Sequence, residues 1–169
     1  IGKKTKWCYP LYHPFYYNIE DWTGQDVLLV ESIGDLLSVS QNTDKKCLVT
    51  FGLDISPALI SCLLEINPSR IILGSNNDLN SEENRGLNAA IKNYLKLLSF
   101  FDFQKIKICL PTQNDFGDMK PKDYNTWDEK LKKISNKRQH LDIKKAAKNL
   151  FENKKLSKNL YSKLKLINE

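Results

Sequence analysis

An apolar strand that ends directly in an acid constrains this chain more than any other feature. Residues 27–30 read Val-Leu-Leu-Val, and Glu31 follows them. A short apolar run without alternation is typical of a strand buried on both faces, as in the parallel sheets of α/β proteins. Such sheets bind their ligands outside the carboxyl ends of the strands. Glu31 is therefore a candidate for chemistry rather than for packing.

Strand and helix patterns then alternate up to about residue 110. Gly52 closes the second strand, and Ser56-Pro57 begins a helix, because serine caps helices and proline suits the first helical position. The predicted strands cover 27–30, 47–51, 71–73 and 106–110, and the predicted helices cover 33–41, 56–66 and about 87–98. Repeated strand–helix units predict an α/β fold, with a sheet of about four mainly parallel strands flanked by helices.

Past residue 125 only helical patterns remain. Thr126 and Glu129 match a capping box, which predicts a helix start there. We predict helices over about 127–135, 141–151 and 156–167, which either surround a small core of their own or dock on the sheet. The predicted organisation is an extended lead-in segment, 1–25, an α/β domain, 26–120, and a basic helical extension, 121–169.

The net charge of +6 is unevenly spread along the chain. Residues 120–169 contain 15 Lys and Arg against 6 Asp and Glu, whereas the rest contain 11 against 14. A basic lobe of this kind can neutralise the phosphates of a nucleic acid. The same composition is equally typical of a solvated helical surface in a lysine-rich protein.

Several classes of protein are disfavoured by what the sequence lacks. The four cysteines form no CxxC pair, so we expect reduced thiols in an intracellular, cytoplasmic protein. No apolar run approaches the ~18 residues of a membrane span, and no signal peptide or phosphate-binding glycine motif is present. His13 and His140 lack the partner pattern of a catalytic triad. Because the chain begins at Ile1 rather than Met, we expect it to be a piece of a longer protein.

Oxygen-bearing side chains follow three of the four predicted strands. The carboxyl ends of parallel strands share one edge, so these side chains are expected to meet there. Carboxylates and amides without neighbouring His or Cys suit Mg²⁺ or Mn²⁺, which commonly serve phosphoryl chemistry. The candidate ligands are Glu31, Asp35, Asn76, Asp78, Asp115 and Asp118.

Four of these residues also have a structural interpretation. Asp35 suits an exposed position on a helix. Asp78 suits a loop or a helix cap, and Asp115 or Asp118 suits a turn.

Taken in order, the motifs resemble a Toprim domain, the metal-binding module of primases, topoisomerases and some nucleases. The resemblance covers about residues 26–120. The first strand with Glu31 and Asp35 is similar to the E-x-x-x-D motif of the primase branch, and Asn76-Asn77-Asp78 stands where the family has D-x-D. Further similar segments are Thr50-Phe51-Gly52, the Arg85–Ala90 helix start, Leu110-Pro111 with its following acids, and the Lys6–Pro14 lead-in.

The resemblance implies a function. It identifies the chain as the Toprim part of a phage-type or viral DNA primase, which makes RNA primers on single-stranded DNA with Mg²⁺ or Mn²⁺. Glu31 would act as general acid/base or as metal ligand, and Asp78 with Asn76 would hold the metal. Asp115 and Asp118 would complete the acidic edge. The implied partners are the template strand, nucleotides and a replicative helicase, in the host cytoplasm if the protein is viral.

Two departures from the family pattern keep other functions open. Asn76 replaces the first acid of D-x-D, and residues 79–83 lengthen the loop that follows. A Toprim-type nuclease would use the same acids with water as the nucleophile. A non-catalytic nucleic-acid-binding module would have kept the fold and lost the metal.

Overall fold

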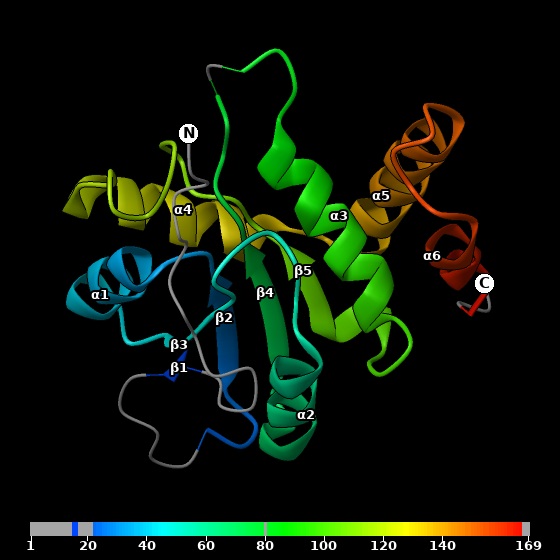
Figure 1. The fold of residues 1–169 in the computed structure, drawn as a ribbon. Coiled ribbons are helices and arrows are strands. Elements are labelled where there is room, and N and C mark those ends of the chain that lie inside the picture. The colour runs from blue at the N-terminus through cyan, green and yellow to red at the C-terminus, as the bar shows by residue number, and fades with distance from the viewer. Residues whose placement is uncertain (1–14, 17–21, 80, 167–169) are drawn as a thin grey trace, which may run out of the picture.

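A central sheet with four parallel strands confirms the predicted α/β fold. The computed structural model describes residues 15–16, 22–79 and 81–166. Its sheet has the order β1-β3-β2-β4-β5, in which β2, β3, β4 and β5 are parallel and the short β1 is antiparallel to β3 (Figure 1). The strands are β1 (Phe15–Tyr16), β2 (Asp26–Val30), β3 (Lys46–Val49), β4 (Arg70–Gly74) and β5 (Ile106–Ile108). Most of the predicted lead-in segment lies outside the described residues.

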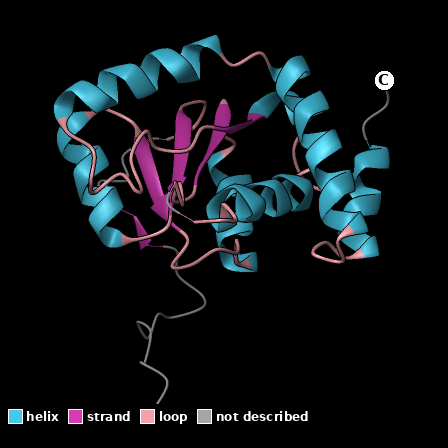
Figure 2. Cartoon of the chain, turned by 90° about the horizontal axis from the view of Figure 1, so that it is seen from above, coloured by secondary structure: helices cyan, strands magenta, loops and turns pink. Residues whose placement is uncertain are grey.

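Helices cover both faces of this sheet (Figure 2). One face packs under α1 and α4, and the other packs under α2 and α3, with α5 and α6 lying against α3. The helices are α1 (Ile33–Asn42), α2 (Pro57–Ile66), α3 (Arg85–Leu97), α4 (Pro121–Lys133), α5 (Asn136–Glu152) and α6 (Lys158–Ser162), with 3-10 turns at Phe103–Lys105 and Lys163–Leu166. None of the helices within the described ranges is long and apolar enough to cross a membrane.

The start of α4 corrects the sequence prediction. The helix begins at Pro121, and the Asp123 side chain accepts a hydrogen bond from the Lys120 backbone N–H at 2.9 Å. Thr126, predicted as the cap, lies inside the helix, where its hydroxyl donates to the Lys122 carbonyl. Proline at the first helical position and an acid in the first turn outweighed the second capping pattern that follows along the chain.

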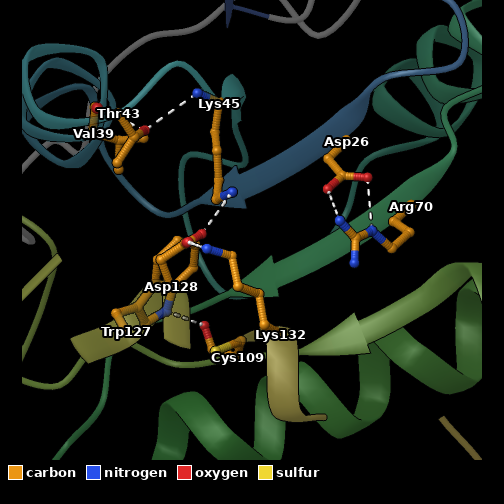
Figure 3. Close-up of polar contacts among 9 residues, drawn as sticks. All are labelled: Asp26, Val39, Thr43, Lys45, Arg70, Cys109, Trp127, Asp128 and Lys132. Atoms are coloured by element: carbon orange, nitrogen blue, oxygen red, sulfur yellow. Dashed lines mark hydrogen bonds and ion pairs between the residues drawn. The ribbon is translucent and has the colours of Figure 1, made fainter. Parts of the chain in front are cut away.

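Helix α4 is built into the sheet core rather than appended to it. The Trp127 side chain is fully buried, and its Nε1 donates to the Cys109 carbonyl at 3.0 Å (Figure 3). Asp128 pairs at 3.1 Å with Lys45, the residue before β3, and this pair links the helix to the sheet. It also pairs at 2.6 Å with Lys132 of the same helix. Of the two arrangements predicted for the C-terminal helices, α4 therefore takes the docked one.

Two further sequence predictions can be compared with the described residues. Cys47 and Cys109 are buried free thiols and Cys62 is half-buried, whereas Cys8 lies outside the described part. Burial raises the pKa of the Cys109 thiol to about 11, so this side chain packs as a small apolar group. Helix α5 begins at Asn136, ahead of its predicted start at residue 141, because Ser135 caps it through the Arg138 N–H.

Candidate functional site

The chain leaves the adjacent strands β2 and β4 toward opposite faces of the sheet. From β2 it enters α1 on one face, and from β4 it enters α3 on the other. A crevice opens at such a switch point, outside the carboxyl ends of the two strands, and open α/β sheets bind ligands there. Glu31 follows β2 directly, and Asn76 lies two residues after β4. We call the region at these two strand ends the switch crevice, after the crevice that open α/β sheets have at this position.

The loop after β5 joins the other two strand ends at this edge. The Asn77 backbone N–H donates to the Asn114 carbonyl at 2.6 Å, and the Asn77 side-chain amide donates to the Pro111 carbonyl at 3.0 Å. The Phe116 N–H donates to Asp35 at 3.1 Å. The structure thus brings together the three segments that carry the candidate acids, although their side chains point to different partners.

Asp35 is a buried structural acceptor. Its side chain accepts hydrogen bonds from the N–H and hydroxyl of Ser32 at 3.0 and 2.7 Å, and from the N–H groups of Phe116 and Gly117 at 3.1 and 3.3 Å. Burial raises its pKa above the ordinary value, and the negative charge of Asp115 adds to this rise. These hydrogen bonds cap α1 and tie the β5 loop to it.

Asp78 faces the first turn of α3. Its carboxylate accepts from the Gly86 N–H at 3.0 Å and lies 3.9 Å from the Arg85 guanidinium. A Cβ atom at Gly86 would stand 1.6 Å from the Asn76 carbonyl oxygen, so only glycine permits this close approach. The glycine therefore holds the start of α3 against the backbone of the switch crevice.

The remaining two acids form a turn. Asp115 accepts a hydrogen bond from the Asp118 N–H at 2.8 Å, and the Asp118 side chain is exposed. A turn at Asp115 or Asp118 was the structural interpretation that the sequence left open for these two residues.

Three buried oxygen atoms stand out at this edge. The Asn76 Oδ1 and Thr112 Oγ1 atoms are buried and have no hydrogen-bond partner among the described residues, and the Glu31 Oε2 atom is buried as well. Buried polar atoms without partners, such as those of Asn76 and Thr112, are rare and call for an explanation such as a bound ion or water. Oxygen donors of this kind fit a hard cation such as Mg²⁺ or Mn²⁺.

The full set of six ligands is not assembled. Within the described residues, no group of three or more His, Cys, Asp and Glu side chains is arranged to hold a metal ion. The residues that fit a cation are Glu31 and Asn76, with Thr112 as the residue that sequence reasoning missed. In the sequence, Thr112 directly follows Leu110-Pro111, where the predicted fourth strand ends, and this position could have marked it as a candidate.

His140, which the sequence left without a partner, lies in the core. Its Nδ1 is 2.9 Å from the Tyr94 hydroxyl, and burial lowers its pKa. It is a packed, hydrogen-bonded side chain of α5 and takes no part in the switch crevice.

Comparisons with known proteins found no relative of this chain. No protein-family model, no curated protein and no solved structure matches the chain. The fold and the crevice therefore define the class of protein, an α/β protein with a doubly wound sheet and an oxygen-lined switch point.

Proposed function

We propose that this chain is the Toprim-like part of a DNA primase, which makes RNA primers on single-stranded DNA. The observation that carries the proposal is the placement of Glu31 and Asn76 on the two sides of the switch point, with a buried amide oxygen that has no partner among the described residues. The motif order along the chain supports the same assignment.

The proposal gives the residues of the switch crevice different roles. Glu31 and Asn76 would hold a divalent cation, with Thr112 beside them. The cation would supply positive charge that stabilises phosphate oxygens during transfer. Asp78 keeps the α3 start against Asn76 through the Gly86 N–H, so it acts as a positioning residue. Glu31, half-buried at the strand end, would serve either as this metal ligand or as the general base that takes a proton from an attacking hydroxyl.

We expect Asn76→Asp to strengthen divalent-metal binding. The substitution adds a carboxylate beside Glu31, and hard cations are usually held by one or two carboxylates. Titration calorimetry with Mn²⁺ on wild type and the variant measures the change. The matched control is Asn149→Asp, which adds the same charge at an exposed position of α5 and should leave the affinity nearly unchanged.

Primer synthesis on a single-stranded template tests the activity itself. Glu31→Gln should lower the rate about 100-fold or more if the carboxylate acts as the base. Equal rates in wild type and Glu31→Gln would refute the role of Glu31. Cleavage of the template in place of synthesis would favour the nuclease instead.

The basic helices give a second prediction, for nucleic-acid binding. Truncation after Lys120 cannot test it, because α4 is part of the sheet core. Replacing the exposed Lys137, Lys145 and Lys158 by Gln should instead flatten the dependence of log K on log salt. On a single strand the expected change is about 0.7 for each phosphate that is no longer neutralised. Fluorescence anisotropy with an oligothymidylate measures the slope, and an unchanged slope would mean that these lysines form only a solvated surface.

One observation favours a second candidate, a non-catalytic nucleic-acid-binding module. Asn76 carries no charge, and Asp78 is turned toward α3, so Glu31 is the acid that follows a strand directly at the crevice. Binding of single-stranded DNA without Mn²⁺ binding, and with no synthesis in either wild type or Asn76→Asp, would support this module over the primase.

A further inference from the structure

Strand β5 ends the sheet on one side, and a glutamine covers its edge. The Ile108 N–H donates to Gln139 Oε1 at 3.0 Å, and Gln139 Nε2 donates to the Ile108 carbonyl at 2.7 Å. A neighbouring strand would make this same pair of hydrogen bonds. The side-chain amide of α5 thus stands where the backbone of a further strand would lie.

A groove with a volume of about 910 Å³ lies over this edge, between α3, α4 and α5. Its apolar floor includes Ile91, Ile108, Leu110 and Ile143, which come from α3, the sheet and α5. Alternate side chains of an extended peptide would reach such a floor, because successive residues of a strand point to opposite faces. The groove and the strand edge are therefore suited to the same ligand.

The rim of the groove favours an acidic ligand. Lys130, Lys133 and Arg138 line it, and within the described part of the chain none of the three forms an ion pair. Glu129 and Asp142 also line the groove, so the rim carries a net positive charge of one. The described residues that line it include no aromatic side chain, and grooves that bind single-stranded nucleic acid usually stack bases on aromatic rings. An acidic peptide therefore fits better than a single strand of DNA.

We propose that this groove binds an extended segment of another protein, in which apolar residues alternate with acidic ones. The segment adds as a strand to β5, takes over the backbone groups of Ile108 from Gln139, and places its acids near Lys130, Lys133 and Arg138. Strand addition of this kind takes affinity from main-chain hydrogen bonds and specificity from alternate side chains.

The probe is a random peptide library, displayed and selected on the whole chain. We expect the enriched peptides to alternate apolar and acidic residues and to lack proline at the positions that pair with β5. Enrichment of basic or unpatterned peptides, or no enrichment, would overturn the proposal.

Charge reversal locates the bound peptide. Lys133→Glu with Arg138→Glu should weaken binding of the best synthetic peptide about tenfold or more, measured by fluorescence anisotropy. Lys145→Glu with Lys158→Glu is the matched control, since it reverses the same number of charges at exposed positions of α5 and α6 outside the groove. Equal affinities for the double variant and the control would overturn the site. Displacement of the peptide by oligothymidylate, with the same weakening in the double variant, would assign the groove to nucleic acid and overturn the peptide proposal.

Hydrogen exchange at the Ile108 amide tests the strand pairing separately. In Gln139→Ala this amide loses its acceptor and should exchange faster than in wild type. Bound peptide should restore its protection and should bind the variant more tightly, because no side chain competes for the edge. Binding without restored protection would overturn strand addition.

Discussion

Replacing Trp127 by alanine is expected to destabilise the folded protein by about 3–5 kcal/mol, the usual cost of removing a large buried aromatic side chain. The Trp127 ring is fully buried and lies edge-on to Phe116, with ring centroids 5.3 Å apart. Its Nε1–H donates to the Cys109 carbonyl, which is buried under α4. The substitution therefore leaves both a cavity and a carbonyl without its donor.

Urea unfolding followed by circular dichroism measures this loss of stability. Trp127→Phe is the informative control, because it keeps an aromatic ring in the core and removes the hydrogen bond with only part of the packing, at an expected cost of about 1–3 kcal/mol. A change below about 1 kcal/mol in Trp127→Ala, well under the usual cost of such a truncation, would show that α4 is an appended helix, as the division of the sequence at residue 120 supposed.

The fold of this chain was accessible from its sequence because strands β2, β3 and β4 each contain an apolar run, whereas β5 has two isoleucines on either side of Lys107. Residues 26–30, 46–49, 70–74 and 106–108 form strands close to the predicted positions. Their order in the sheet also decided which loops meet, and the meeting of the Glu31, Asn76 and Pro111 segments follows from it. The unbroken apolar runs carry this information because strands buried on both faces consist mostly of apolar residues. Lys107 of β5 is the exception, and its buried side chain donates to the Ile134 carbonyl at 3.1 Å.

The sequence could not predict which partner each acidic side chain contacts. Asp35 stands three residues after Ser32, which is a local capping pattern, yet its two other donors come from residues 116 and 117. Such hydrogen bonds depend on where two distant loops meet, and no local pattern reports them. The groove beside β5 was missed for the same reason, since it arises from the packing of α5 against the sheet edge through Gln139.

Replacing Asp35 by alanine should cost about 3 kcal/mol or more of folding stability. The change leaves the buried N–H of Phe116 without its acceptor, at a cost of about 1–3 kcal/mol, and it removes the part-buried hydrogen bonds of the Ser32 and Gly117 N–H groups, at about 0.5–1.5 kcal/mol each. Asp35→Asn should cost less, because an amide oxygen can still accept from the β5 loop. Urea unfolding of both variants at neutral pH measures the difference.

The pH dependence of Asp35 has a definite sign. Burial raises its pKa in the folded state above the ordinary 3.8, so the folded protein binds this proton more tightly than the unfolded chain does. Wild type should therefore gain stability relative to Asp35→Asn as the pH falls from the raised value toward 3.8. The gain should be absent well above the raised pKa, where the carboxylate is ionised in both states.

This comparison also separates the structural role of Asp35 from the metal-binding role that the sequence suggested. A structural acceptor predicts that Asp35→Asn changes the stability and its pH dependence, while the affinity for Mn²⁺ stays nearly unchanged, because the amide and the carboxylate alike anchor the loop beside Asn76. A metal ligand predicts the reverse, since removal of a carboxylate weakens the hold on a hard cation. Unfolding curves at several pH values and Mn²⁺ titrations on the same two proteins decide between them. A large drop in Mn²⁺ affinity with unchanged unfolding curves would return Asp35 to the metal site.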